Sequence, residues 1–146
     1  MTELTEIRAF NGPNRWLSNF WPSPFEIDGR QYATVEHYYQ ASKAISDLDH
    51  ERVRTLATPG QAKRGGQKVE IRADWDALKE VYMLQGLRKK FAPGTELGDR
   101  LQATGSIQLI EWNKWGDTYW GVSNGRGRNR LGHLLMQVRQ ELIMRG

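Results

Sequence analysis

The sequence contains no cysteine, which excludes a disulfide framework, a cysteine-based zinc site and a thiol nucleophile. It has no apolar run of membrane-spanning length, and the acidic stretch at residues 2–6 is unlike a signal peptide. The histidines His37, His50 and His133 stand too far apart to match a metal-ligand spacing. Neither a dinucleotide fingerprint nor a serine nucleophile elbow is present. These absences predict a protein of a reducing cytoplasm that needs no metal and no cofactor.

The composition is that of a globular protein with a modest basic excess. A chain of 146 residues, 38% hydrophobic and 26% charged, is long enough for one domain with its own core. The net charge of +4 favours an anionic ligand, although 17 acidic residues dilute the effect. The six tryptophans offer flat faces that suit stacking on nucleobases, while core packing is their commoner use.

The stretch at residues 34–46, TVEHYYQASKAIS, predicts one amphipathic helix with Thr34 as its N-cap. At about 100° per residue, Glu36, Gln40 and Lys43 fall within an arc of about 60°. The adjoining arc is mostly apolar or aromatic and includes Tyr39. A carboxylate, an amide and an amine would then stand in line beside an aromatic wall. The competing interpretation is an ordinary surface helix with a Glu/Lys pair.

The remaining elements follow from turn signals and periodicity. Helical signals cover 51–57 (after a connector at 47–51), 58–66, 75–91, 95–105 and 131–144. Strand signals cover 7–10, the two arms of a hairpin around Asp28-Gly29, and 107–112, which we expect to pair back with 119–123. With no repeat or linker, this order predicts a single α+β domain over residues 1–146. We expect it to be mostly helical, with two small antiparallel β pieces.

A glycine- and arginine-rich loop, NGRGRNR at residues 124–130, precedes the last predicted helix. Gly125 and Gly127 would let backbone N–H groups approach a phosphate, and the helix N-terminus would add its positive end. Arg126 and Arg128 would strengthen such an anion site. An arginine loop that contacts a nucleic-acid backbone, or one that only faces solvent, are the alternatives.

The candidates for chemistry are two carboxylates and an amine, Glu36, Asp117 and Lys43. A lysine attacks only as the neutral amine, so its pKa must be lowered by burial or by a neighbouring cation. Packing of Lys43 beside Tyr39 would meet that condition, whereas an ionised Glu36 would oppose it. The sequence leaves this balance open.

Several long motifs occur in a fixed order along the chain. They are LSNF-WPSPFEIDG-YATVEHYYQASKA, Ala62-Lys63 with Gly66, Asp74-Trp75, Lys90-Phe91, Leu101, Thr104-Gly105, Asp117-x-x-Trp120-Gly121, and Gly125-x-Gly127-x-Asn129-x-Leu131-Gly132-x-Leu134-Leu135-Met136. This series resembles the NADAR (YbiA-like) family over about residues 10 to 142. In one departure, Gln67 follows Gly66 where many members carry arginine, which argues against a phosphate role at that position.

The resemblance implies the YbiA-like fold and an N-glycosidase that hydrolyses the bond between ribose C1 and a base nitrogen. Two substrate classes are implied: phosphorylated ribosylamino-pyrimidine intermediates of riboflavin biosynthesis, and ADP-ribosylated guanine in DNA or RNA. The implied chemistry is attack of a lysine through a Schiff-base adduct, with carboxylates moving protons. By motif these residues are Lys43, Glu36 and Asp117. No membrane and no protein partner is implied.

Combined with the helix geometry, the resemblance predicts a substrate-binding set of aromatic, small polar and loop residues. It comprises Trp16, Ser18, Asn19, Phe20, Tyr39, Gln40, Trp120, Gly125, Arg126, Gly127, Arg128 and Asn129. The aromatic residues would stack on the base, the small polar ones would bind the ribose or base edges, and the loop would bind phosphate. For Phe20 and Tyr39, core packing is the rival interpretation. A non-catalytic module that binds NAD or ADP-ribose, and a small nucleic-acid-binding protein, are the rival functions.

Overall fold

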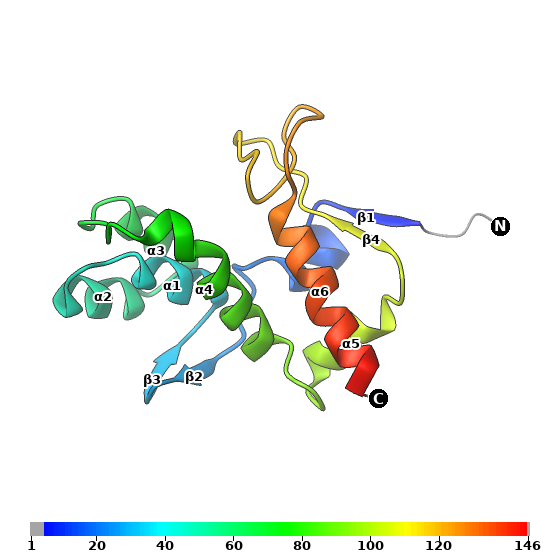
Figure 1. Ribbon diagram of the computed structural model, residues 1–146, viewed down its shortest axis with the longest axis horizontal. Coiled ribbons are helices and arrows are strands. Elements are labelled where there is room, and N and C mark those ends of the chain that lie inside the picture. Colours follow the sequence, from blue (N-terminus) through cyan, green and yellow to red (C-terminus); the bar gives the residue numbers. More distant parts are fainter. Residues whose placement is uncertain (1–4, 146) are drawn as a thin grey trace. The chain divides into compact units, whose positions relative to one another are not determined.

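The computed structural model describes residues 5–145 (Figure 1). The chain forms two compact units. The middle unit comprises Asn19–Lys90, and the terminal unit comprises the described residues up to Ser18 and from Phe91 onward. Within residues 5–145, no helix is long and apolar enough to cross a membrane. The assignment of residues 1–146 to a single domain stays a prediction.

The middle unit is built around its first helix, α1. Its elements are β2 (Phe25–Ile27), β3 (Arg30–Tyr32), α1 (Val35–Ser42), α2 (Asp47–Arg54), α3 (Pro59–Gly66) and α4 (Trp75–Lys90). Helix α1 contacts α2, α3, α4 and β3, and every one of its residues is buried. It is therefore the central helix of the unit, and Figure 1 labels it together with α2, α3, α4 and β3.

The predicted hairpin is confirmed. Asp28 and Gly29 both have positive φ, 52° and 80°, as a two-residue turn between antiparallel strands requires. Phe25 and Tyr32 face each other across the strands with ring centroids 5.9 Å apart. The ring of Tyr38 on α1 meets both edge-on, at 5.9 and 5.0 Å. These aromatic contacts dock the hairpin on the central helix.

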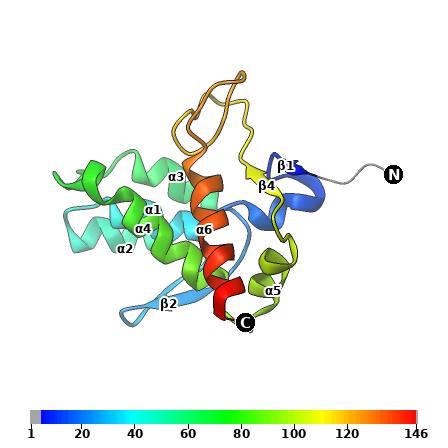
Figure 2. The same ribbon diagram turned by 45° about the vertical axis from the view of Figure 1, so that its right-hand side comes forward.

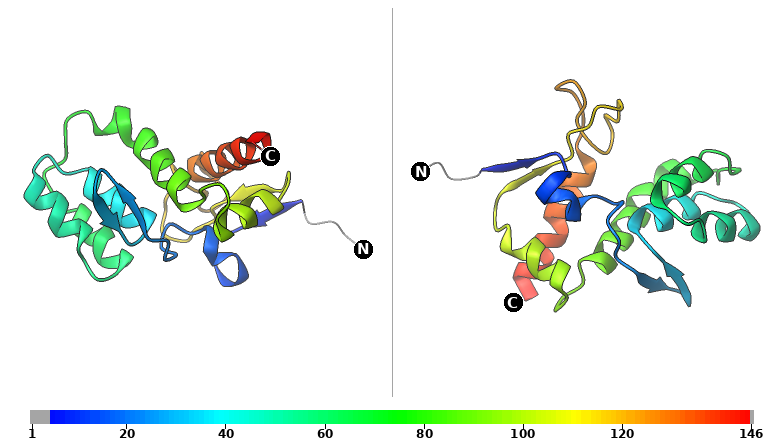
Figure 3. Two further views of the ribbon diagram at one scale, coloured as in Figure 1. Left: turned by 90° about the horizontal axis from the view of Figure 1, so that it is seen from below. Right: turned by 180° about the vertical axis from the view of Figure 1, so that it is seen from behind.

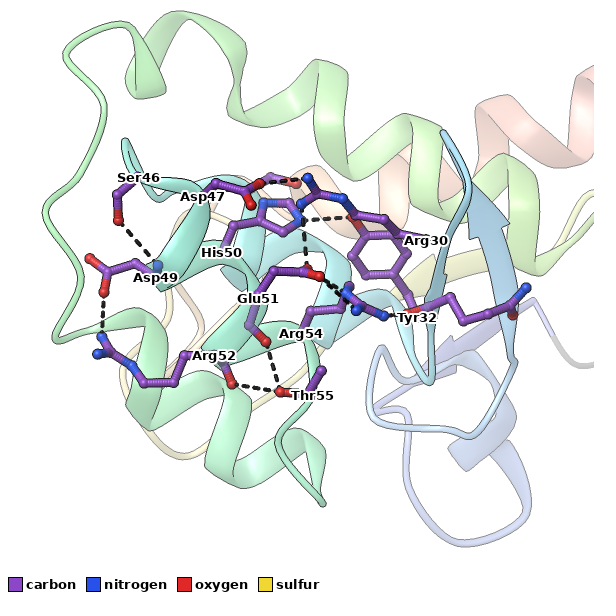
Figure 4. Close-up of polar contacts among 12 residues, drawn as sticks. Arg30, Tyr32, Ser46, Asp47, Asp49, His50, Glu51, Arg52, Arg54 and Thr55 are labelled. Carbon is purple, nitrogen blue, oxygen red and sulfur yellow. Dashed lines mark hydrogen bonds and ion pairs between the residues drawn. The ribbon is translucent and has the colours of Figure 1, made fainter.

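Polar contacts attach the same hairpin to α2 (Figure 4). Arg30 pairs with Glu51 at 3.4 Å, and Arg54 pairs with Glu51 at 2.6 Å while donating to the Gln31 carbonyl at 2.9 Å. Tyr32 Oη and His50 Nε2 lie 2.8 Å apart. Exposed ion pairs contribute little individually, so the buried aromatic contacts supply most of the stabilisation.

Helix α1 is shorter than predicted. Its N-cap is Thr34 as expected, since the Thr34 hydroxyl accepts from the His37 amide at 3.1 Å. The helix ends at Ser42 instead of Ser46 because the next residues turn to bond with residues 70–72. The Ile45 amide donates to Glu70 and the Arg72 amide donates to Lys43.

The chain enters helix α2 directly after this turn. The Ser46 hydroxyl accepts from the Asp49 amide, so residues 47–51, expected to be a connector, form the first part of α2. The helical signal predicted at 51–57 covers only its end. By contrast, α3 begins at Pro59 behind the Thr58 cap and ends at Gly66, as predicted.

Among its described residues, the terminal unit holds a second pair of strands, one 3₁₀ helix and two α-helices. Its elements are β1 (Glu6–Arg8), the 3₁₀ helix η1 (Gly12–Leu17), α5 (Glu96–Ala103), β4 (Gln108–Ile110) and α6 (Arg130–Arg145). Figure 2 shows β1 beside β4, and Figure 3 shows α5 (yellow-green) alongside α6 (red). The mostly helical α+β class is therefore confirmed.

The predicted pairing of the second β piece is wrong. Strand β4 pairs in parallel with β1, not in an antiparallel hairpin with residues 119–123. Only an isolated bridge joins Trp112 to Val122. Residues 118–121 instead accept hydrogen bonds from the amides of residues 128–131. One β piece is thus antiparallel and the other is parallel.

The apolar face predicted for the last helix is confirmed. Leu131, Leu134, Leu135, Val138 and Leu142 are all buried on α6. They follow the helical repeat of three to four residues, which turns them toward one side. Helix α6 contacts α5 and β4, so this face forms the core of the terminal unit.

Candidate active site

Glu36 and Gln40 are joined on the central helix. Both are buried, with 8% and 5% of their surface exposed. Gln40 Nε2 donates to Glu36 Oε2 at 2.6 Å, one helical turn away. This bond fixes the orientation of the carboxylate. It also shows that Glu36 and Gln40 share one face of the helix, as predicted.

Gln40 is held from the other side by helix α3. A Cβ atom added to Gly66 would lie 2.0 Å from Gln40 Oε1 and 2.9 Å from Gln40 Cβ. Only glycine therefore permits this approach of the two helices. Gln40 Oε1 is buried and has no hydrogen-bond donor among the described residues, so contact with Gly66 and the bond to Glu36 define its position.

Lys43 lies directly after α1, as the residue that caps its C-terminal end. The side chain is half-buried, and Nζ lies 5.4 Å from the centroid of the Tyr39 ring. Burial lowers the pKa of Lys43, the charge of Glu36 opposes this, and the charges of Lys63 and Lys79 lower the pKa further. The balance that the sequence left open is therefore a lowered pKa, which makes the neutral amine more accessible than in a free lysine.

Tyr39 connects Lys43 to an aromatic cluster. Its ring is 7% exposed and packs 5.1 Å from Trp75, at the start of α4. Trp75 in turn lies 5.6 Å from Tyr82, whose hydroxyl accepts from Arg72 at 2.6 Å. Tyr39 thus packs in the core and also faces the amine. Trp75 was not among the predicted site residues, although the Asp74-Trp75 motif pointed to it.

Asn19 and Phe20 belong to the same unit. The Asn19 carbonyl accepts from the Glu36 amide at 3.2 Å, so this residue lies at the beginning of α1. Its Nδ2 lies 3.4 Å from Met83 Sδ, and its buried Oδ1 has no donor among the described residues. Phe20 is 41% exposed, which agrees better with a surface that a ligand contacts than with core packing.

Asp117, in the terminal unit, is fixed by backbone amides. Its Oδ1 accepts from the amides of Tyr119 and Trp120 at 3.1 and 2.9 Å. Asn113 Oδ1 accepts from the Asp117 amide at 3.0 Å. Trp120 is half-buried, and its ring meets that of Tyr119 edge-on at 4.9 Å. The carboxylate is therefore rigidly oriented by a turn.

The backbone of the Gly/Arg loop (residues 124–130) is largely used within the fold. The amides of Arg128, Asn129, Arg130 and Leu131 donate to carbonyls of residues 118–121. The first amides of α6 are thus bonded within the unit, whereas a phosphate contact at Gly125 and Gly127 stays a prediction. The arginine side chains stay as the charged groups of the loop: Arg126 is exposed, and Arg128 lies 4.9 Å from the Tyr119 ring.

Two other residues of this loop serve the fold. Asn129 has φ 49° and is buried; its Oδ1 accepts from the Glu111 amide at 3.0 Å, and its Nδ2 donates to the Leu109 carbonyl at 2.9 Å. A Cβ on Gly127 would lie 2.1 Å from the Gly121 carbonyl oxygen. Asn129 thus serves the fold through both side-chain atoms, and its role as a phosphate ligand stays a prediction.

Trp16 is a core residue of the terminal unit. It is 6% exposed; its ring meets Phe91 edge-on at 6.2 Å, and the Arg100 guanidinium lies 4.5 Å from its centroid. Stacking of a base on Trp16 would require these neighbours to move, and the role of Trp16 in the site stays a prediction. Ser18 follows η1, and its amide donates to the Arg15 carbonyl at 3.0 Å.

The predicted site residues therefore fall into two groups. The middle unit brings together Asn19, Phe20, Glu36, Tyr39, Gln40 and Lys43, and the terminal unit holds Trp16, Ser18, Asp117, Trp120 and the Gly/Arg loop. Among residues 5–145, no three His, Cys, Asp or Glu side chains are grouped to hold a metal ion.

Comparison with known proteins gives consistent matches. The family model of the NADAR domain matches residues 8–143. N-glycosidase YbiA of Shigella boydii is 40% identical over 131 residues, which is 88% of this chain and 81% of that protein. Riboflavin biosynthesis protein VVA0006 of Vibrio vulnificus is 36% identical over 130 residues, 87% of this chain and 35% of that protein. The NMR structure of E. coli YbiA covers 99% of this chain and 89% of its own, with a TM-score of 0.86 at 35% identity.

Proposed function

The chain belongs to the NADAR domain family, and we propose that it is an N-glycosidase that hydrolyses the bond between a ribose C1 and a base nitrogen. The name of the Shigella relative supports this reaction. The observation that carries the proposal is Lys43, a half-buried amine beside Tyr39 whose pKa is lowered by burial and by two further lysines. A lowered pKa increases the share of the neutral amine, which is the form that attacks carbon.

The reaction begins with attack of the neutral Lys43 Nζ on ribose C1. The bond from C1 to the base nitrogen breaks, and the base leaves with the electron pair and takes up a proton. The amine loses its extra proton, and its lone pair then expels the ring oxygen, which is protonated as the sugar opens. This gives a Schiff base between Lys43 and C1. Water adds to C1, the amine leaves, and the free sugar closes again.

Two carboxylates move the protons in this scheme. Glu36, held by Gln40 at Oε2, accepts the proton that Lys43 loses on attack and returns it in a later step. Asp117, fixed by two amides at Oδ1, is the second acid or orients the sugar hydroxyls. Phe20 and Trp120 contact the base, while Gln40 positions Glu36.

Both substrate classes implied by the family resemblance fit this chemistry. Each has a ribose C1 bonded to nitrogen and a phosphate on the same sugar. The name of the Vibrio relative supports a ribosylamino-pyrimidine intermediate of riboflavin biosynthesis. ADP-ribosylated guanine in DNA or RNA is the second class. The cytoplasmic location of the protein stays a prediction.

The test offers the protein two substrates in parallel, a 5′-phosphorylated ribosylamino-pyrimidine and DNA that carries ADP-ribosyl-guanine. Release of the sugar phosphate is followed for wild type, Lys43→Ala and the control Lys89→Ala, which alters an exposed lysine. We expect release from at least one substrate, lost in Lys43→Ala and kept in the control. Borohydride added during turnover should trap the Schiff base as a covalent adduct, absent in Lys43→Ala.

The outcomes separate enzyme from binding module. Unchanged turnover in Lys43→Ala would overturn the role of the lysine. Binding of either compound by calorimetry, without release, would instead identify a non-catalytic ADP-ribose or nucleotide module. Thermal midpoints of all variants establish that a lost activity is not lost folding.

A further inference from the structure

Lys43 lies where helix α1 has ended, so its backbone is held by another segment of the chain. The Lys43 carbonyl accepts from the Arg72 amide at 2.9 Å. Next to this bond, Ala44 and Ile71 form an isolated antiparallel bridge. Arg72 is therefore attached directly to the backbone of the candidate nucleophile.

The side chain of Arg72 extends this attachment to helix α4. Its Nη1 donates to the Tyr82 hydroxyl at 2.6 Å. Its Nε and Nη2 donate to the two carboxylate oxygens of Asp74 at 2.8 and 3.1 Å. Each nitrogen of the guanidinium thus has a partner, and this fork geometry holds the group in one orientation.

These contacts close into a ring that begins and ends at Lys43. The Tyr82 ring lies 5.6 Å from Trp75, and Trp75 lies 5.1 Å from Tyr39. The Tyr39 ring centroid lies 5.4 Å from Lys43 Nζ. The ring of contacts runs from the lysine carbonyl through Arg72 and the three aromatic residues back to the lysine amine. All of it lies within the middle unit.

An amine on a flexible side chain attacks efficiently only if its position is fixed. Lysine carries its amine at the end of a long carbon chain with several rotatable bonds. A misplacement of about 1 Å at a reacting group costs about a hundredfold in rate. The Tyr39 ring restricts Nζ only while the ring itself stays in place. The bond from Arg72 to Tyr82 ties the aromatic cluster to the backbone at Lys43.

We propose that Arg72 is a positioning residue for the Lys43 amine. Its guanidinium fixes Tyr82, and two further aromatic contacts transmit this constraint to the ring beside Nζ. The proposal rests on the N-glycosidase function proposed above. Arg72 takes no part in the bond changes of that reaction and acts through the residues that hold the amine.

The experiment removes the bond between Arg72 and Tyr82 from each side. Tyr82→Phe keeps the ring and loses only the hydroxyl that accepts at 2.6 Å. Arg72→Gln removes the guanidinium and keeps the amide that bonds to Lys43. The matched control is Tyr38→Phe, which removes a bond of similar length between α1 and α4, from the Tyr38 hydroxyl to Gln85 at 2.7 Å.

The kinetic readout separates kcat from KM, with whichever of the two substrates the wild type hydrolyses. We expect Tyr82→Phe and Arg72→Gln each to lower kcat about tenfold and to change KM less than about twofold. The double variant should lose no more than either single variant, because both changes break one bond. Tyr38→Phe should keep the wild-type kcat.

A second readout needs no turnover. In protein labelled with ¹³C-lysine, the Cε resonance of Lys43 is identified by its absence from Lys43→Ala. The nearby Tyr39 ring displaces this resonance from the value of a free lysine. We expect Tyr82→Phe and Arg72→Gln to move it toward the free value, and Tyr38→Phe to leave it unchanged.

The outcomes are decisive in either case. A Tyr82→Phe variant that keeps the wild-type kcat or the wild-type Lys43 resonance would overturn the proposal, as would an equal loss of kcat in Tyr38→Phe. If the wild type releases no sugar, the N-glycosidase function fails, and the resonance alone decides whether Arg72 positions the amine. Thermal midpoints identify variants that do not fold. If Arg72→Gln is one of them, the nearly isosteric Tyr82→Phe decides.

Discussion

Substitution of Gly66 by alanine tests the packing that holds Glu36. The added Cβ would lie 2.0 Å from Gln40 Oε1 and 2.9 Å from Gln40 Cβ and Cδ. Because Gln40 Cβ is fixed to the buried helix α1, the amide must rotate away, and its 2.6 Å bond to the Glu36 carboxylate breaks. Gly66→Ala thus perturbs the carboxylate without touching it.

The expected loss of stability follows from three contributions. A hydrogen bond to a buried charged group contributes about 1.5–3 kcal/mol. Overpacking costs about 1–3 kcal/mol. Replacing glycine by alanine in a helix returns about 1 kcal/mol. The net destabilisation is about 1.5–5 kcal/mol, which for a chain of this size lowers the thermal midpoint by about 4–20 °C.

The assay is thermal and denaturant unfolding with two matched variants. Gly60→Ala, in the same helix, has no neighbour closer than 3.7 Å and should be neutral or slightly stabilising. In a Gln40→Ala background the contacts with Oε1 and Cδ are removed and only the 2.9 Å approach to Cβ remains, so Gly66→Ala should cost less there, with a coupling energy of about 2 kcal/mol. Equal effects of Gly66→Ala and Gly60→Ala, or a full cost that persists without Gln40, would refute this reasoning.

Three further predictions concern charge and the loop. Because attack needs the neutral amine and the pKa of Lys43 is lowered, kcat/KM should rise with pH and level off below the free-lysine range, and Lys79→Gln should move this limb to higher pH. Burial lowers the pKa of Lys90 to about 7, so the free energy of unfolding should rise between pH 7 and about 10, where Lys90 is protonated only in the unfolded chain. In denaturant unfolding, the extra stability of Lys90→Met over the wild type should therefore shrink by up to about 1.4 kcal/mol per pH unit across this window. A difference that stays constant with pH would contradict this prediction. Asn129→Ala breaks two buried bonds at a positive φ and should cost about 3 kcal/mol by the same method, whereas Arg126→Ala should leave stability unchanged.

Local signals were sufficient for much of the fold. The Asp28-Gly29 turn, the threonine caps at Thr34, Thr58 and Thr95, and the apolar spacing of α6 each act within a few residues, and each is confirmed. The errors involve distant partners. The end of α1 depends on bonds to residues 70–72, and β4 pairs with a strand about a hundred residues earlier. No local pattern encodes such a partner.

The same distinction applies to the site. Trp16 and Phe20 lie in one aromatic stretch, yet one is 6% and the other 41% exposed. The difference arises because Phe91 and Arg100, far along the chain, cover Trp16. Asn129 likewise reads as a polar loop residue until Leu109 and Glu111 are placed against it. The aromatic or polar character of these side chains is evident from the sequence, whereas their burial depends on residues far along the chain.

For Lys43, the position near the other candidates was predictable from local sequence and the charge state was not. The helix repeat places it near Glu36 and Tyr39, so its identity as a candidate needed only local sequence. Its charge state needed the fold, since the two lysines that oppose Glu36 come from α3 and α4. A single neighbouring carboxylate would have favoured the ammonium form, which cannot attack carbon. Burial and the charges of the two lysines oppose that preference and lower the pKa of Lys43, so the fold moves this amine toward the form that attacks.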